Sequence, residues 1–326
     1  NTTGDLNVAI GTSALQNNVI GDRAVAIGHN ALRDQNPTSN VDTYNVAVGL
    51  NSQFATTTGI ENTSVGGYSM SNNTTGSNNV AVGRDALRQN TTGNGNVAIG
   101  QYASDAISSN NYTTAVGYNA MTANTASNGV AVGAYAMTAN TSGDYNTAVG
   151  YSALELNTTG YENVAIGHKA LEANTVAGRN IAVGAYALDT NETGVDNVAI
   201  GHKALDAQTD GDHNIAIGSY ALDANTTADH NTGIGYHALG VNTTGIKNVA
   251  LGNYALDANV THAYNTAIGY ASLSANTADN NTAVGFESLK LNTTGEKNVA
   301  IGSLAMGAGG TDPDGNVAIG YEALKV

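Results

Sequence analysis

Apolar and polar positions alternate along this chain in a motif of the form Asn-Val-Ala-Ile-Gly, which returns about every seventeen residues. Its glycine occupies nineteen positions, and fourteen of the eighteen intervals between them are 17 residues long. These glycines are Gly11, Gly28, Gly49, Gly66, Gly83, Gly100, Gly117, Gly133, Gly150, Gly167, Gly184, Gly201, Gly218, Gly235, Gly252, Gly269, Gly285, Gly302 and Gly320. A fixed period of this kind indicates a repeat architecture, so residues 1–326 are predicted to form a single continuous solenoid.

The apolar part of each repeat is typical of one short strand with two apolar faces. Val164 and Ile166 share one face and Ala165 occupies the other, because alternate residues of a strand point to opposite sides. We expect the β-branched pair to pack inside a coil and the alanine to face another backbone layer. Gly167 then permits a turn that a Cβ would hinder, and Leu171 returns into the same core.

The remainder of each repeat is more polar and ends in turn residues, such as Asn-Thr-Thr-Gly at 157–160. The segment between them, 169–173 for example, has good helix propensity, but five residues make a poor isolated helix. A second short strand is therefore favoured over a helical turn. The fold class predicted is all-β: a parallel β-solenoid (β-roll) of about nineteen 17-residue repeats, whose coils, spaced about 4.8 Å apart, would form a rod roughly 90 Å long.

Two stretches add residues to the repeat, and the chain begins and ends within the pattern. Four residues are added around Asn36-Pro37, which predicts an irregular loop near 33–44, and a further insertion predicts another near 307–315. Additions in solenoids become loops on one face and are candidates for binding. The incomplete ends suggest a fragment of a longer fibre.

A weaker 34-residue alternation involves tyrosine, which stands one or two residues after the repeat glycine. Tyrosine combines contact area with a hydroxyl, which suits carbohydrate or protein contact, although the rings could equally cover an edge or a subunit seam. The alternation leaves open whether one coil takes 17 or 34 residues. The candidate contact surface consists of Tyr102, Tyr118, Tyr135, Tyr151, Tyr186, Tyr220, Tyr236, Tyr254 and Tyr270.

Composition narrows the class of protein. With 26 acidic and 11 basic residues the formal charge is −15, so nucleic acid is not an expected partner, because phosphate binding needs clustered Lys and Arg. An apolar fraction of 41% is too high for disorder, whereas 2 Phe and no Trp are too few for a thick core. No apolar stretch approaches the roughly 18 residues of a membrane span, so direct membrane insertion is not expected.

The sequence offers little chemistry beyond the repeat. The absence of cysteine excludes disulfides and thiolate metal sites, no nucleophile elbow occurs, and neither an enzyme nor a cofactor is expected. On five successive repeats a carboxylate lies five residues after the glycine, where a hard cation such as Ca²⁺ could bridge the five, or where they simply form a solvated acidic stripe. These weak calcium candidates are Glu155, Glu172, Asp189, Asp206 and Asp223.

Asparagine and threonine columns are the most regular polar features. An asparagine precedes the strand in sixteen of the nineteen repeats, as at Asn180 and Asn197, and the stacked amides are expected to hydrogen-bond along the solenoid. Adjacent threonines, such as Thr243-Thr244, raise an ice-binding hypothesis, although they stand beside turn glycines. Several asparagines also fall in Asn-x-Ser/Thr sequons, which accept glycans in a eukaryotic secretory route, among them Asn90, Asn157, Asn242 and Asn292.

The repeated Asn-[Val/Thr]-Ala-[Ile/Val]-Gly with short polar turns resembles the head repeats of trimeric autotransporter adhesins. The alternation with Asn-Thr-Thr-Gly is also similar to shaft segments of phage-like tail fibres. The resemblance implies a homotrimeric rod of parallel β-rolls, and it departs from the adhesin heads in its longer period. A trimer axis would cover the small face of the strand, which makes the subunit interface Ala148, Ala165, Ala182, Ala199 and Ala216.

Together these observations predict a non-enzymatic extracellular fibre segment, on a cell surface or a virion, that supplies stiffness and multivalent attachment. Its expected partners are further copies of itself and, on a host surface, carbohydrate or protein. A self-assembling extracellular filament subunit and an ice-binding β-solenoid are the alternatives.

Overall fold

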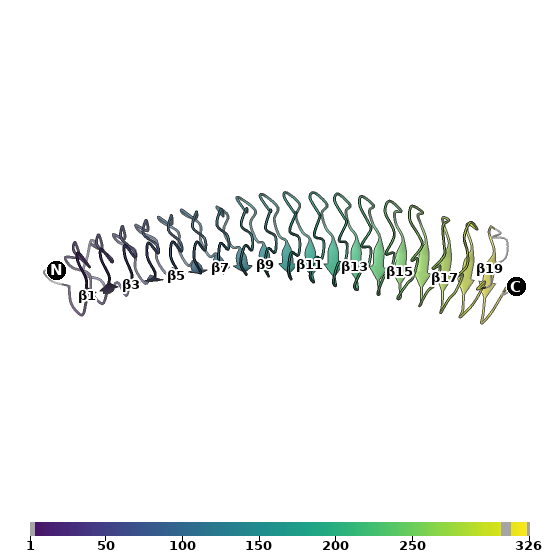
Figure 1. The fold of residues 1–326 in the computed structure, drawn as a ribbon, viewed down its shortest axis with the longest axis horizontal. Helices are drawn as coiled ribbons and strands as arrows, with labels where there is room; N and C mark the ends of the chain where they lie inside the picture. Colours follow the sequence, from purple (N-terminus) through teal and green to yellow (C-terminus); the bar gives the residue numbers. More distant parts are fainter. Residues whose placement is uncertain (1–3, 308–313, 325–326) are drawn as a thin grey trace. The chain divides into compact units, whose positions relative to one another are not determined.

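The computed structural model describes residues 4–307 and 314–324, which are organised in two units, Asn1–Glu162 and Asn163–Val326. Within the described residues each repeat contributes one three-residue strand, and the rest of the coil is turn (Figure 1). Unit 1 contains β1 (Val8–Ile10), β2 (Val25–Ile27), β3 (Val46–Val48), β4 (Thr63–Val65), β5 (Val80–Val82), β6 (Val97–Ile99), β7 (Thr114–Val116), β8 (Val130–Val132) and β9 (Thr147–Val149). Unit 2 contains β10 (Val164–Ile166), β11 (Ile181–Val183), β12 (Val198–Ile200), β13 (Ile215–Ile217), β14 (Thr232–Ile234), β15 (Val249–Leu251), β16 (Thr266–Ile268), β17 (Thr282–Val284), β18 (Val299–Ile301) and β19 (Val317–Ile319).

Successive strands within each unit pair in parallel, displaced by one repeat. Val164 of β10 lies opposite Ile181 of β11, and Ala165 lies opposite Ala182. The same register relates β5 to β6 in unit 1. Because paired residues are 17 apart, one coil is one repeat, and the 34-residue alternation is not the coil length. The prediction of an all-β parallel β-solenoid with 17-residue coils is confirmed.

The alanine of each strand points into the coil, and the β-branched residues point out of it. Ala165 is fully buried, whereas Ile166 is 40% exposed. Leu171 fills the interior from the turn and is also fully buried. At Gly233, which replaces the alanine of its strand, an added Cβ would lie 3.2 Å from Leu222 Cγ. The interior therefore has room for one large side chain per coil and little more.

This arrangement overturns the predicted orientation of the strand. We expected Val and Ile inside and alanine outside, and the narrow coil reverses the two faces. The predicted subunit interface is wrong for the same reason, because its alanines are fully buried within the single chain and face no second chain. These alanines are Ala148, Ala165, Ala182, Ala199 and Ala216.

The second half of each repeat forms two tight turns and not the predicted second strand. In the coil after β10, the Ala170 N–H donates to Gly167 O (3.4 Å) and the Asn174 N–H to Leu171 O (3.3 Å). Leu171 has φ 53°, a left-handed conformation that costs a non-glycine residue about 1–2 kcal/mol. The neighbouring coil holds it there, since the Leu171 N–H donates to Ala187 O at 3.1 Å.

Gly167 confirms the predicted turn and adds a second reason for glycine. Its φ is +136°, and a Cβ at this position would lie 2.5 Å from Gly184 O in the next coil. The strand is therefore followed by a point where two backbones touch, which only glycine permits.

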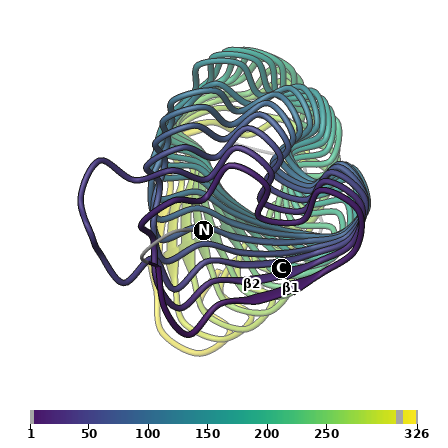
Figure 2. The same cartoon turned by 90° about the vertical axis from the view of Figure 1, so that its left-hand side faces the viewer.

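The insertion between Gly28 and Gly49 forms the predicted loop, seen at the dark N-terminal end in Figure 2. Asp22 and Asp42 form a parallel bridge at its base, and Pro37 is buried against the preceding coil. Most of the other predicted loop, near 307–315, lies outside the described residues.

Gly66 and Gly67 provide a matched test of coil-to-coil contact. A Cβ at Gly66 would lie 2.5 Å from Gly83 O, and its φ is +139°, whereas a Cβ at Gly67 meets nothing within 4 Å. Gly66→Ala should lower the free energy of unfolding by more than about 2 kcal/mol. Gly67→Ala should change it by less than about 1 kcal/mol. Denaturant melts of both variants measure this, and equal losses would contradict the tight contact.

Candidate functional site

A row of aromatic rings, here called the ring ladder, lies on the turn that follows the strand, from β10 to β17 in unit 2 and from β6 to β9 in unit 1. In unit 2 each coil of the row has a ring that contacts the next, with centroids 5.1–6.3 Å apart. The coil of Tyr236 has a second ring, His237, which stacks on Tyr220 and Tyr254. In unit 1 the centroids are 5.5–6.4 Å apart. The unit 2 ladder consists of His168, Tyr186, His202, Tyr220, Tyr236, Tyr254, Tyr270 and Phe286, and the unit 1 ladder of Tyr102, Tyr118, Tyr135 and Tyr151.

The 34-residue alternation in the sequence is explained by the geometry of this ladder. Rings attached at the same place on successive coils would lie parallel, about 4.8 Å apart. Attachment alternates between the first and second residue after the glycine, and the rings meet edge to face, as Tyr236 and Tyr254 do at 79°. Tyr270 and Phe286 share the first position, and their planes differ by only 11°. Alternating attachment thus produces the edge-to-face contacts that aromatic rings favour.

The ladder also alternates in exposure. Rings at the first position are exposed, with Tyr151 at 49% and Tyr270 at 47%, whereas Tyr186 and Tyr220 at the second position are half-buried and Tyr254, also at the second position, is exposed to a lesser extent at 36%. Equivalent rings therefore recur every two coils, about 10 Å apart.

All nine tyrosines predicted as a contact surface belong to the ring ladders. Their function as a contact surface stays a prediction, but they form one row in each unit. Phe286, His168 and His202 were not among the candidates, although their offset from the repeat glycine is the same as that of the tyrosines. This offset in the sequence could have identified the three residues as members of the ring ladder.

The carboxylates proposed for calcium divide into paired and unpaired members. Lys169 Nζ lies 2.9 Å from Glu172, and Lys203 Nζ lies 3.1 Å from Asp206, each within its own coil. Asp189 has Tyr186 where its neighbours have lysine. Burial raises the pKa of Asp189 to about 6, aided by the charges of Glu172 and Asp206, and Lys169 offsets part of the shift.

The structure does not bring the calcium candidates into a metal site. Among the described residues, no three carboxylate or imidazole groups lie close enough to hold an ion. Glu172, Asp189, Asp206 and Asp223 follow one another on successive coils of unit 2, Glu155 lies in unit 1, and all five side chains are half-buried.

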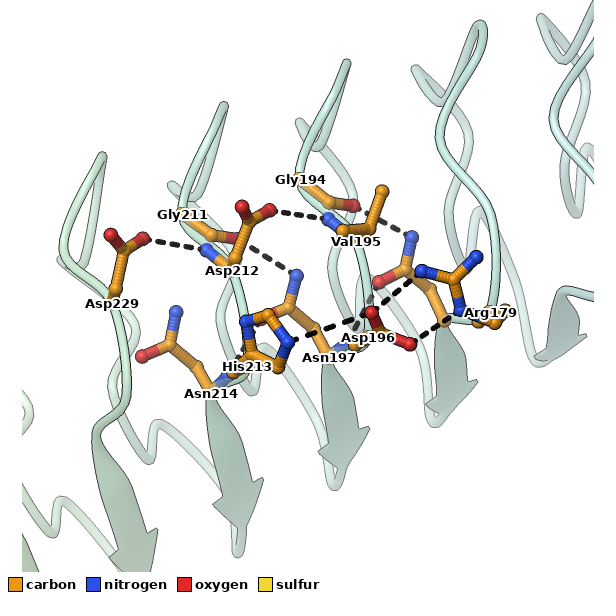
Figure 3. A network of polar contacts seen from close by, with 11 residues as sticks. Arg179, Gly194, Val195, Asp196, Asn197, Gly211, Asp212, His213, Asn214 and Asp229 are labelled. Carbon is orange, nitrogen blue, oxygen red and sulfur yellow. Dashed lines mark hydrogen bonds and ion pairs between the residues drawn. The ribbon is translucent and has the colours of Figure 1, made fainter.

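Buried asparagines connect the coils from inside. The Asn197 backbone N–H donates to Asn180 Oδ1 (2.9 Å), and Asn197 Nδ2 donates to Gly211 O (2.8 Å) (Figure 3). Asn214 repeats the first bond onto Asn197 Oδ1 at 2.8 Å. The predicted amide ladder is confirmed, and each member satisfies groups in two neighbouring coils.

The sequon asparagines belong to the same kind of buried column. The Asn157 side chain is fully buried and donates to Asn140 Oδ1 (2.7 Å) and Gly160 O (2.9 Å). In the folded chain these four side chains have at most 6% of their surface exposed: Asn90, Asn157, Asn242 and Asn292.

Charged side chains add bonds on the outside of the same turns (Figure 3). Arg179 donates to both carboxylate oxygens of Asp196 at 2.7 Å, which lowers the pKa of that carboxyl. His213 Nε2 lies 3.7 Å from Asp196. Asp212 accepts from the Val195 backbone N–H at 2.7 Å. These contacts join residues of consecutive coils, as the Asp212 backbone N–H also does by donating to Asp229 Oδ1 at 2.8 Å.

The threonines that suggested ice binding are engaged along the stack. Thr226 Oγ1 donates to Thr243 O (3.2 Å), and Thr243 Oγ1 donates to Val260 O (3.0 Å). They stand on turns, and their hydroxyls bond the next coil, so this column does not favour an ice-binding face.

No protein-family model and no curated protein matches this sequence. Within the described residues, the structure contains no helix long and apolar enough to cross a membrane.

The raised pKa of Asp189 predicts how stability depends on pH. Because the folded pKa of about 6 exceeds the ordinary value of 3.8, the folded state holds the proton more tightly than the unfolded state. The contribution of Asp189 to the free energy of unfolding is therefore greatest below about pH 4 and is lost as the pH rises through about 6. Asp189→Asn should remove this decline and raise the melting temperature at pH 7.

Glu192→Gln, an exposed carboxylate in the turn of the same coil, is the matched control and should leave the pH profile unchanged. Melting curves from pH 4 to pH 8 provide the measurement. A wild-type stability that rises between pH 4 and pH 6.5, with the same rise in Asp189→Asn, would contradict the assignment.

Proposed function

We propose that this chain is a non-enzymatic, extracellular fibre segment that supplies a stiff and repetitive scaffold for attachment. The observation that carries the proposal is that hydrogen bonds join neighbouring coils on every side of the coil. In the coil of β11 the Ile181 N–H donates to Asn197 O (2.8 Å) at the strand, and the Leu188 N–H donates to Ala204 O (2.9 Å) at the first turn. The Glu192 N–H donates to Thr209 O (3.0 Å) at the last turn.

Bonds distributed in this way resist bending in every direction. Tilting one coil against the next lengthens backbone bonds on one side, and the buried asparagines resist the same motion from within. A coil gains its interior only from its neighbours, so stiffness and folding have a common origin.

The repeat also presents the same surface many times. The ring ladders offer equivalent exposed rings at every second coil, which suits many weak contacts whose combined strength exceeds that of any one. The resemblance to adhesin heads and tail-fibre shafts, with the lack of cysteine, supports a position on a cell surface or a virion.

Whole repeats should act as units of length. Deleting 185–218, which is 34 residues and two coils, joins Gly184 to Ser219 in the same register. This variant should unfold cooperatively and be shorter by about 10 Å in small-angle scattering. Deleting 185–210 is the control, because it misaligns the strand with its neighbours, and it should lose cooperative unfolding. Loss of folding in both variants, or in neither, would count against the proposal.

We further propose that the fibre is a homotrimer, as the resemblance implies, with the interface on the outward strand face in place of the alanines. Ile166 and Ile200 are 40% and 38% exposed there, and Leu251 is 43% exposed. These residues belong to an apolar strip along the outward strand face of unit 2, and an exposed apolar strip of this kind marks an interface.

The mass of the particle tests this interface. Sedimentation of the wild type should give three times the chain mass of 32.9 kDa. Ile166→Glu with Ile200→Glu should give single chains, because burying carboxylates in an apolar interface is unfavourable. Val176→Glu with Val241→Glu, at exposed turn positions, should leave the mass unchanged. A wild type that sediments as one chain would exclude the trimer.

A further inference from the structure

We propose that the ring ladder binds neutral, extended β-1,4-linked glycans of the cello- or chito-oligosaccharide class, lying along the stack of coils. This inference rests on the attachment part of the proposed function and names its ligand. It follows from the exposure of the rings, their period and the charge around them.

The exposed rings have the chemistry that pyranose sugars require. Tyr236 is 40% exposed, and Phe286 is 49% exposed, although each contacts a ring in an adjacent coil. A β-linked pyranose with equatorial hydroxyls has apolar C–H faces that stack on aromatic rings, and its rim of hydroxyls can bond tyrosine hydroxyls. A row of such rings offers a flat sugar several contacts in line.

The period of the ladder selects the linkage. Equivalent rings recur every two coils, about 10 Å apart. In an extended β-1,4-linked glycan each sugar is turned half a revolution from the last, so the chain repeats every two sugars over a closely similar length. Such a glycan keeps the same relation to each exposed ring along the unit. An α-1,4-linked glycan curves into a helix and loses the ladder after one or two contacts.

The surrounding charge selects a neutral ligand. Lys203 Nζ lies 5.8 Å from the Tyr186 ring centroid but is paired with Asp206 at 3.1 Å. Asp223 and Asp257 stand three residues beyond Tyr220 and Tyr254 in their own coils. With a formal chain charge of −15, polyanionic glycans would be repelled.

The test uses the full chain and cellohexaose or chitohexaose in isothermal titration, with cellulose and chitin sedimentation as a second assay. Maltohexaose is the α-linked comparison and should bind at least about tenfold more weakly. The ladder variant replaces exposed rings that lie outside the left-handed backbone region, so that the fold is retained. Its substitutions are Tyr118→Ala, Tyr151→Ala, Tyr236→Ala and Tyr270→Ala.

The ladder variant should lose at least about tenfold in affinity, since each stacking contact contributes to binding. Tyrosine-to-phenylalanine replacements at the same four positions keep the rings and should stay within about threefold of the wild type. A control variant removes four tyrosines from another turn, all at least 49% exposed, and should bind as the wild type does: Tyr44→Ala, Tyr112→Ala, Tyr145→Ala and Tyr264→Ala. These four residues have left-handed backbones, so the melting temperatures of both variants are measured to show that each remains folded.

Three results of the binding assays would overturn the proposal. They are no uptake of either β-linked hexamer or polymer, an equal loss in the control variant, and binding of maltohexaose as tight as that of cellohexaose. A ladder variant whose particle mass falls would show that a second copy covers the rings, which also overturns it. The deletion experiment tests the fibre scaffold separately, so a lack of glycan binding would not contradict the scaffold proposal.

Discussion

The hydrogen bond between a residue and its equivalent one repeat later is the constraint on which this structure depends. It sets every coil about one strand spacing from the next, in the turns as well as the strands. At that spacing two backbones meet at the repeat glycine, where a Cβ at Gly201 would lie 2.6 Å from Gly218 C. Left-handed residues such as Leu205 (φ 54°) are tolerated for the same reason, since the adjacent coil fixes their backbone.

The spacing also determines which side chains can be inside. A coil of this length encloses a strand alanine and one leucine, with amides that complete the bonds of the turns. The β-branched residues of the strands lie outside, where Val, Ile and Thr form a regular face. The aromatic rings also depend on the spacing between coils, which is too wide for tight parallel stacking. Because the point of attachment alternates, neighbouring rings meet edge to face instead. The composition of the core, the outward face of the strands and the arrangement of the ring ladder therefore all follow from the spacing between successive coils.

The sequence predicted the strand, the glycine turn and the asparagine ladder because each depends on local residue chemistry repeated at a fixed period. It did not predict which face of Val164-Ala165-Ile166 is inside, since a two-residue alternation separates the faces without ranking them. Which face is inside depends on the width of the coil. That width follows from left-handed turns at residues such as Lys169 and Leu171, and neither residue type indicates a left-handed backbone in the sequence. The tyrosine offsets were readable, but their contacts required knowing that one coil is one repeat.

Because the sequon amides are buried, it matters during biosynthesis whether glycosylation or folding comes first. Asn157 exposes none of its surface once the coils have stacked, so an oligosaccharyltransferase could modify it only on the unfolded chain. A sugar attached then would occupy the place of the bonds to Asn140 and Gly160 and prevent the next coil from closing. In a eukaryotic secretory pathway glycosylation would thus compete with folding. In a cell that lacks this transferase there would be no such competition.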